Sequence, residues 1–469
     1  MIGVRSAGGV TTHLLEGQPS PRSIASTNLA QRILGARLVG SRAGFCVVAS
    51  GGTLKPRLLL REAVEVASEP ARGKILTSAT APLLVGLLFV ALNLRPAISS
   101  VPPLLETIRQ DLGLGRAFLG LLTTIPVLCM SALALIAPRI SGRIGAERAV
   151  LWSVVLIGAA VAGRLVAGQA SVLFVTTLVA GVGIAVAQSL LPAVVKGWFP
   201  DRAALVTGLY TVGITGGLAL AALATVPIER LLGGFWPGAL AVWSLLAVVA
   251  AVSWAPLTSR ARSAPRREGA HERARLPWRS GQAWSVALFF GAESCLFFSS
   301  LTWIAPLYVD QGLDKGAAGL LLAVFALIRV PSAFVFPALA DRSGDRRPWL
   351  ALTLILTTLG FCAMGIVPLA TPWAPLAWVV VLGLGIGGLF PLALTLPLDY
   401  SADAEEAGRL TAMAFFVGYI VAAVGPVAVG ALRDATGGYA IPFGALATIS
   451  VIMLAASPRF RPPRLGSHS

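Results

Sequence analysis

An internal repeat at a spacing of 199 residues constrains the fold of this chain more than any other feature. Each copy consists of a turn, a long apolar run and a short basic turn, and the two copies align without a gap. The matched positions are Asp111 with Asp310, Leu114 with Leu313, Arg116 with Lys315, Gly120 with Gly319, Pro138 with Pro337, Arg143 with Arg342, Gly145 with Gly344 and Arg148 with Arg347. Repeated sets of membrane helices in other chains place a solute site between two related halves. The repeat therefore bears on function as well as on fold.

The composition predicts a membrane protein that is built of helices. Of the 469 residues, 56% are hydrophobic and only 12% are charged. The apolar runs have the length that a helix needs to cross a bilayer core about 30 Å thick. Barrel strands would alternate apolar and polar residues, whereas runs such as 151–162 and 378–390 are apolar on every face. We expect an all-α fold with twelve spans in two pseudo-symmetric six-helix bundles, near residues 81–104, 117–138, 149–168, 172–195, 203–227, 235–256, 283–306, 316–340, 349–370, 374–398, 410–431 and 438–457.

The basic residues report the orientation of the chain in the membrane. The net charge is +16, and most of the Arg and Lys side chains fall in alternate turns, in the central loop and in the two tails. Cytoplasmic loops carry such an excess, so both termini are predicted to lie in the cytoplasm. The same distribution argues against nucleic acid as a partner and favours the lipid bilayer.

Five regions follow from the pattern of apolar runs and charges. We expect a disordered basic cytoplasmic tail or a mis-assigned start at 1–78, an N-terminal bundle at 79–256, a basic cytoplasmic linker at 257–282, a C-terminal bundle at 283–457 and a cytoplasmic tail at 458–469. The tail and the linker have too little apolar content to fold a soluble output domain, which argues against a membrane sensor. The four cysteines show no paired spacing, and we expect no metal and no cofactor.

Two nucleotide-binding patterns are excluded by their context. Gly383, Gly385 and Gly388 satisfy GxGxxG, but they lie inside a run of membrane length that no strand precedes. No Walker A motif is present, because Gly73-Lys74 is followed by Ile75. The three histidines lie outside the spans, and no catalytic set of side chains gathers near a membrane face. We therefore expect no enzymatic activity.

The basic turn at 337–347 resembles the inter-helix signature of the major facilitator superfamily. Its signature residues are Asp341, Arg342, Gly344, Arg346 and Arg347. The first copy supplies Gly142, Arg143 and Gly145, with Gly142 where the acidic residue is expected. The segments 93–96, 191–196, 199–201, 390–398 and 403–407 are similar to the cyanate permease and nitroimidazole transporter branch. The resemblance implies that spans one, four, seven and ten line a central cavity, and that the substrate is a small solute such as cyanate or a nitroimidazole.

Arg95 is the most informative charge inside the predicted spans. An arginine at the centre of a membrane helix costs about 2.5–3.5 kcal/mol on insertion, so it needs a partner or a purpose. Pro96 follows it and should loosen the helix at that point. The forked guanidinium suits a small anion. The alternative is a packing role, in which Arg95 binds carbonyl groups of neighbouring helices.

Glu293 and Arg329 lie at similar depths in two neighbouring antiparallel spans. A structural ion pair that fixes the register of the two helices is one prediction. The sharper hypothesis makes Glu293 the carboxylate that couples transport to protons, since burial raises the pKa of a carboxyl group and Arg329 opposes that rise.

Neutral side chains complete the predicted substrate site. We include Asn93 and Gln188 as orienting groups, and Trp303 and Phe390 as rings that stack on a flat solute, beside Arg95 and Glu293. Single amides and aromatic residues in apolar helices also serve packing. Two arginines against one glutamate leave a positive surplus, which favours an anion in the cavity.

The leading hypothesis is a secondary transporter of the bacterial inner membrane that moves a cyanate-like anion or a nitroimidazole-like compound by alternating access. We expect a monomer, with protons as the candidate coupling ion. The alternatives are a multidrug-type efflux carrier for neutral aromatic compounds and a sensor that transports nothing.

Overall fold

The computed structural model describes residues 37–41, 44–48, 80–258, 276–401 and 404–459. The chain forms two separate units, Met1–Ile75 and Leu76–Ser469. In the first unit the described strands are β1 (Arg37–Ser41) and β2 (Gly44–Val48), which pair antiparallel with Arg37 opposite Val48. The rest of the tail at 1–78, most of the central basic linker and the end of the C-terminal tail lie outside the described residues.

The second unit confirms the twelve predicted spans. Among the described residues, twelve helical stretches are long and apolar enough to cross a bilayer. The first six spans are built from α3 (Ala81–Asn93), α4 (Pro96–Ser99), η1 (Pro102–Leu104), α5 (Leu105–Leu112), α6 (Arg116–Ala134), α7 (Ala137–Ile144), α8 (Ala146–Gly163), η2 (Arg164–Val166), α9 (Ala170–Trp198), η3 (Pro200–Arg202), α10 (Ala203–Leu231), α11 (Trp236–Ala241) and α12 (Ser244–Trp254). The last six are α13 (Gly281–Asp310), α14 (Lys315–Ser343), α15 (Arg347–Ile366), α16 (Ala374–Asp399), α17 (Ala404–Thr436) and α18 (Ala440–Ala456), followed by η5 (Ser457–Arg459).

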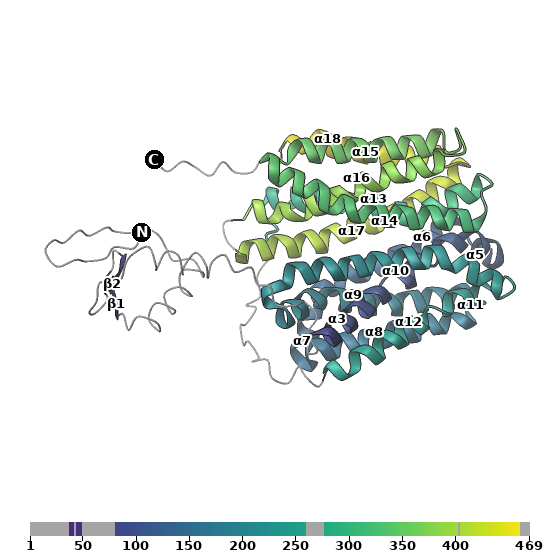
Figure 1. Ribbon diagram of the computed structural model, residues 1–469. Helices are drawn as coiled ribbons and strands as arrows, with labels where there is room; N and C mark the ends of the chain where they lie inside the picture. Colours follow the sequence, from purple (N-terminus) through teal and green to yellow (C-terminus); the bar gives the residue numbers. More distant parts are fainter. Residues whose placement is uncertain (1–36, 42–43, 49–79, 259–275, 402–403, 460–469) are drawn as a thin grey trace. The chain divides into compact units, whose positions relative to one another are not determined.

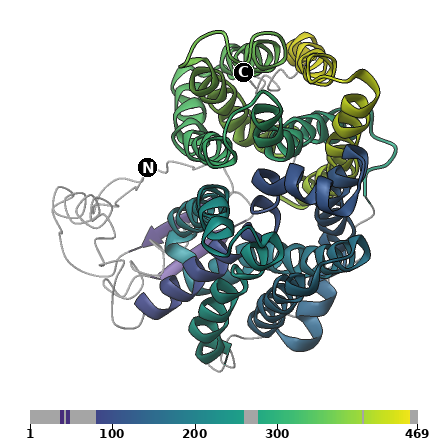
Figure 2. The ribbon, with the colours of Figure 1, turned by 90° about the vertical axis from the view of Figure 1, so that its right-hand side faces the viewer.

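The helices of this unit run side by side in two groups. Figure 1 shows α3–α12 on one side and α13–α18 on the other, and Figure 2 shows the same helices end-on. The two groups meet along two pairs of helices, α6 with α17 and α10 with α14. We call the groups the first and second halves.

Several helices are longer than the apolar runs that predicted them. The first span was expected to end near residue 104, but it continues through α5 to Leu112. Polar and charged residues within α5 pair with one another and with the neighbouring helices, so the helix extends beyond the apolar core. We call this the outer end of the unit, following the predicted orientation.

The repeat is visible in the backbone. Gly145 and Gly344, which are equivalent in the two copies, both have positive φ angles, of 88° and 68°. Gly113 and Gly312 are also 199 residues apart and have φ angles of 62° and 92°. Glycine adopts this left-handed conformation without a steric penalty, so both copies turn at the same points.

The seventh span is the most enclosed of the twelve. In its most apolar stretch 89% of the residues are buried, against 39–61% in the other spans. Helix α13 contacts α14, α16, α17 and α18 of its own half, and also α5, α6 and η1 of the first half. Side chains on α13 therefore lie where the two halves meet.

Candidate functional site

The first span is interrupted at Arg95. Helix α3 ends at Asn93 and α4 begins at Pro96, as the proline predicted. Pro96 has no N–H group to donate to the carbonyl of Leu92. That carbonyl points at α10, where a Cβ atom on Gly217 would lie only 2.0 Å from its oxygen. The break thus depends on a close approach between two helices, and it places Arg95 at their junction.

The guanidinium of Arg95 is buried and has no hydrogen-bond acceptor among the described residues. Arg95 is 9% exposed, its Nη1 atom is buried, and none of its side-chain nitrogens donates a hydrogen bond to another described residue. Its Cζ atom lies 5.9 Å from the ring centre of Phe298 in α13. The carbonyl contacts that the packing alternative required are not found among the described residues. A buried cation without partners is costly, which leaves a ligand or water to satisfy it.

Glu293 and Arg329 do not form the direct ion pair that their depths suggested. Glu293 is fully buried; its Oε2 accepts a hydrogen bond from Ser294 at 3.1 Å, and its Oε1 has no hydrogen-bond partner in the described part of the chain. The guanidinium of Arg329 instead lies 3.9 Å from the ring centre of Phe297, and it donates no hydrogen bond to a described residue. The face of Phe297 holds the cation by a cation–π contact, so the two charges interact at longer range.

Aromatic rings surround these charges. Phe290 lies 6.1 Å from Phe390, 5.3 Å from Phe415 and 5.8 Å from Tyr419, measured between ring centres. Phe298, which contacts Arg95, lies 6.5 Å from Tyr419. Phe390 was predicted from the sequence, and the structure places it in this ring cluster beside the turn of α13 that carries Glu293.

The amide side chains add two more unsatisfied atoms. Nδ2 of Asn93 and Oε1 of Gln188 are buried, and neither has a hydrogen-bond partner within the residues that the structure describes. Asn93 ends α3, two residues before Arg95, and Gln188 lies in α9. Five of the predicted residues therefore have a buried polar atom with no hydrogen-bond partner among the described residues: Asn93, Arg95, Gln188, Glu293 and Arg329.

Trp303 lies in a different environment. Its indole N–H donates to the carbonyl oxygen of Pro426 at 2.8 Å, and its ring lies 2.8 Å from the position of a Cβ atom on Gly430. It also contacts the ring of Tyr439. These contacts join α13, α17 and α18 towards the outer end. The structure thus gives Trp303 packing partners of its own, apart from the ring cluster around Phe290.

The signature turns lie at the opposite end of the helices. In the second copy Arg346 donates to Thr395 of α16 at 3.0 Å and lies 3.9 Å from Asp341 of α14. Hydrogen bonds from the side chain and backbone of Arg347 lower the pKa of Asp345. Arg342 and, in the first copy, Arg143 are exposed; Gly142 lies in the last turn of α7, and Gly145 links α7 to α8. These turns connect helices within a half.

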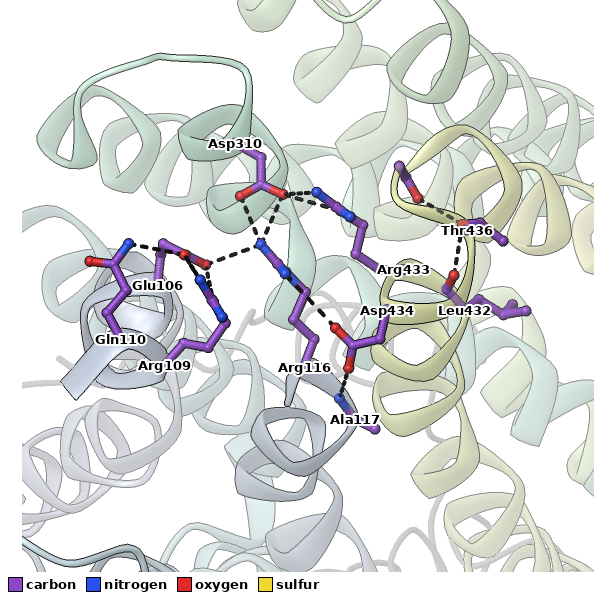
Figure 3. Close-up of polar contacts among 11 residues, drawn as sticks. Glu106, Arg109, Gln110, Arg116, Ala117, Asp310, Leu432, Arg433, Asp434 and Thr436 are labelled. Carbon is purple, nitrogen blue, oxygen red and sulfur yellow. Dashed lines mark hydrogen bonds and ion pairs between the residues drawn. The ribbon is translucent and has the colours of Figure 1, made fainter. Parts of the chain in front are cut away.

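The outer ends of the two halves are joined by charged groups that sequence reasoning did not single out. Arg116 of α6 donates to both oxygens of Asp310 in α13, at 3.2 and 3.3 Å. It also contacts Glu106 at 3.3 Å and Asp434 at 3.8 Å, as Figure 3 shows. Arg433 also donates to Asp310, to its Oδ2 atom at 2.8 Å. Arg116 and Asp310 are both about 14% exposed or less, so water screens their attraction only in part. We call this network the first latch.

A second latch joins α10 and α14. Lys315 donates to Glu229 and to Thr107, both at 3.1 Å, and Arg230 pairs with Asp314. Lys315 is the repeat partner of Arg116, so equivalent basic residues reach across to the opposite half in both latches. The repeat contained this signal, because it marked the two positions as matched basic residues.

Hydrogen bonds deeper in the membrane continue the contact between the halves. Thr124 of α6 donates to the carbonyl of Ala423 in α17 at 2.6 Å, and Ser131 donates to that of Phe416 at 2.7 Å. Thr302 of α13 donates to Thr123 at 2.9 Å. The two halves are therefore closed against each other from the outer end as far as the buried charges.

Comparison with known proteins decides the family. The profile of the Major Facilitator Superfamily matches residues 83–426 and 294–468. The chain belongs to the major facilitator superfamily. It is 34% identical over 385 residues to the cyanate transport protein CynX of Escherichia coli, a match that covers 81% of this chain and 98% of that protein. It is 32% identical to the 2-nitroimidazole transporter of the same organism, over 79% of this chain and 93% of that one. An uncharacterized transporter of Bacillus subtilis, YycB, is 33% identical over 80% of this chain and 92% of its own length.

Solved structures of this superfamily share the fold. A D-xylose–proton symporter superposes with a TM-score of 0.67 at 12% identity, covering 81% of this chain and 98% of that one. A bacterial homolog of the human lysosomal transporter Spinster, inward-facing and unoccupied, gives a TM-score of 0.66 at 16% identity, over 81% and 95% of the two chains. As a member of the major facilitator superfamily, the protein is a multi-pass membrane transporter.

Proposed function

We propose that this superfamily member is a secondary transporter that moves a small anion across the bacterial cytoplasmic membrane by alternating access, with both termini in the cytoplasm. The observation that carries the proposal is the guanidinium of Arg95, which is buried where the halves meet and has no acceptor among the described residues. A bound anion would supply that acceptor. The similarity to a cyanate transport protein favours the same solute class.

The charges around the site favour an anion over a neutral or cationic solute. Arg329 interacts electrostatically with the carboxylate of Glu293 and with the guanidinium of Arg95, so these three groups carry a surplus of one positive charge when Glu293 is ionised. A monoanion neutralises that surplus, whereas a cation would add to it. A forked guanidinium also offers paired donors to a solute with several acceptor atoms.

The latches support alternating access. The outer ends are tied by Arg116 with Asp310 and by Lys315 with Glu229, so a solute from that side requires both contacts to open. Breaking the latches while the opposite ends of α6, α10, α14 and α17 approach each other would expose the site to the outside.

Glu293 is the candidate for proton coupling. Its buried Oε1 atom has no hydrogen-bond partner in the part of the chain that the structure describes, and the carboxylate interacts electrostatically with Arg329. Protonation would remove the negative charge that opposes anion binding, so the site would hold an anion more tightly once a proton is bound. This linkage would move the proton and the anion across the membrane in the same direction.

Counterflow in proteoliposomes tests the proposal. Vesicles loaded with unlabelled cyanate are diluted into labelled cyanate, with nitrate, nitrite and 2-nitroimidazole as competitors. We expect labelled cyanate to accumulate in the wild type and to fall to background in Arg95→Ala. The matched control is Arg139→Ala, because Arg139 is exposed in α7 and its one hydrogen bond to a described residue goes to the carbonyl of Leu135 in the preceding turn. Competition by cations alone would refute the anion site.

A second candidate function rests on the aromatic rings. The rings of Phe390, Phe415 and Tyr419 all pack against Phe290, and such a cluster of aromatic rings would suit a flat neutral compound. Such a carrier would export aromatic compounds and would not need Arg95. Competition by neutral 2-nitroimidazole that persists in Arg95→Ala would favour this function over the first.

A further inference from the structure

Tyr419 is a residue of α17 whose direction is fixed by packing on both sides. A Cβ atom at the preceding Gly418 would lie 2.6 Å from the ring of Phe290 in α13, so the two helices touch here. On the other side, the hydroxyl of Ser131 in α6 donates to the carbonyl oxygen of Phe416 at 2.7 Å. These contacts prevent α17 from rotating about its axis, and they hold Tyr419 towards the buried charges.

The ring of Tyr419 lies across the turn of α13 that carries Glu293. It meets Phe290 edge-on at 5.8 Å and Phe298 edge-on at 6.5 Å. Phe290, Ser294 and Phe298 are spaced four residues apart and therefore share one face of the helix. Ser294 donates to Glu293 at 3.1 Å between those two rings.

Arg95 approaches the same place from the opposite half. Its Cζ atom lies 5.9 Å from the ring centre of Phe298, so Arg95 and Tyr419 contact one common ring. Arg95 and Glu293 are the charged groups that act electrostatically on the Tyr419 hydroxyl. Among the described residues, that hydroxyl donates no hydrogen bond and accepts none. A guanidinium and a phenol, one from each half, thus both have free donors beside Phe298.

We propose that Tyr419 is a specificity-determining residue of the anion site: its hydroxyl and the guanidinium of Arg95 bind two different acceptor atoms of the same solute. The inference rests on the proposed function and refines it, since it concerns which anions are carried. It selects small anions with two or more acceptor atoms, such as nitrite or cyanate, over a single-atom anion such as chloride.

A phenylalanine at position 419 would pack as well as the tyrosine does, so packing does not explain the hydroxyl group. All the ring contacts of Tyr419 are to carbon rings, and phenylalanine would keep them. A tyrosine hydroxyl inside a protein normally finds a partner, as that of Tyr308 does in donating to the carbonyl of Pro375 at 3.4 Å. A solute that bridges Arg95 and Tyr419 would also link the two halves, which couples binding to their relative position.

The test compares inhibition by two anions in cyanate counterflow. Sodium nitrite and sodium chloride compete against labelled cyanate in wild type, Tyr419→Phe and the matched control Tyr308→Phe. A hydrogen bond to a charged group contributes about 1.5–3 kcal/mol, so we expect the nitrite inhibition constant to rise about tenfold or more in Tyr419→Phe. The chloride constant is expected to stay within about twofold, because chloride needs only Arg95, whereas the cyanate concentration for half-maximal counterflow should rise together with the nitrite constant. Tyr308→Phe should leave the nitrite-to-chloride ratio unchanged.

Tyr419→Gln guards against a purely structural explanation, since it removes the ring but retains an N–H donor. We expect it to keep more of the preference for nitrite than Tyr419→Phe does. An unchanged nitrite-to-chloride ratio in Tyr419→Phe, or an equal loss of both anions, would overturn the role of Tyr419. Absence of both cyanate and nitrite counterflow in the wild type would instead overturn the proposed function itself.

Discussion

Gly120 of α6 and Gly319 of α14 occupy equivalent positions in the two copies of the repeat, and each lies against a backbone carbonyl of the opposite half. A Cβ atom at Gly120 would lie 2.5 Å from the oxygen of Pro426, and one at Gly319 would lie 2.5 Å from the oxygen of Ala222. Each glycine lies four residues after the basic residue of a latch, Gly120 after Arg116 and Gly319 after Lys315. The halves therefore close at the outer end through two related contacts, each combining a charge and a close backbone approach.

Gly120→Ala should prevent the outer ends from closing fully. Backbone cannot yield as a flexible side chain can, and overpacking of this kind costs about 1–3 kcal/mol. We expect counterflow to fall about tenfold or more while the protein remains folded by thermal denaturation. The control is Gly444→Ala in α18, where a Cβ atom would meet nothing within 4 Å. Normal counterflow in Gly120→Ala would show that this contact is not needed for turnover.

Asp310→Asn should weaken the first latch, because it removes the charge that accepts from both Arg116 and Arg433. Loss of about 1.5 kcal/mol would raise the population of the outward-open state roughly tenfold. A Thr123→Cys reporter measures this, since Thr123 is buried below the latch and hydrogen-bonded to Thr302. We expect faster labelling by a membrane-impermeant maleimide added outside.

The control for that experiment is Asp345→Asn, which removes a carboxylate of the opposite end that pairs only within its own turn. It should leave labelling of the Thr123→Cys reporter unchanged. Equal labelling rates in Asp310→Asn and in the parent would mean that the first latch does not hold the outer end closed.

Arg95→Lys separates charge from geometry at the site. The ammonium keeps the positive charge but loses the planar fork of donors. We expect the concentration of cyanate for half-maximal counterflow to rise about tenfold, between the wild type and the inactive Arg95→Ala. Kinetics in proteoliposomes at several cyanate concentrations provide the measurement. Wild-type counterflow kinetics in Arg95→Lys would mean that the site recognises cyanate by positive charge alone and does not need the planar fork of donors.

Glu293→Gln should uncouple transport from protons. The amide mimics the protonated carboxyl group and cannot release a proton, so exchange of substrate should continue while uptake against a gradient is lost. Uptake of labelled cyanate is compared with and without an imposed pH gradient, beside counterflow under symmetric conditions. A variant that still concentrates cyanate in response to the pH gradient would exclude Glu293 from coupling.

Local sequence was sufficient to predict the membrane spans and the break in the first span. Each apolar run is long enough to require a bilayer, and Pro96 cannot complete the helical hydrogen bond at Leu92. The pairing of Glu293 with Arg329 could not be judged in this way. Helix depth gave the height of the two charges but not the position of the Phe297 ring, which decided where the guanidinium lies.

Trp303 also shows that the sequence alone does not give the contacts of a side chain. As an aromatic residue of the seventh span it was a reasonable candidate for stacking on a solute, yet its N–H group is taken by Pro426 of another helix. Tyr419 was overlooked because nothing in its own segment marks it. Only the packing of α17 on α13 turns it towards Arg95.

By itself the sequence determined twelve spans, two related halves and a basic residue at the break in the first span, because hydrophobic length, repetition and proline act over short stretches of chain. Tertiary structure alone decided which charges meet. Arg116 and Asp310 are 194 residues apart and are brought together by the lateral packing of helices, which depends on the shapes of side chains on every neighbouring span at once.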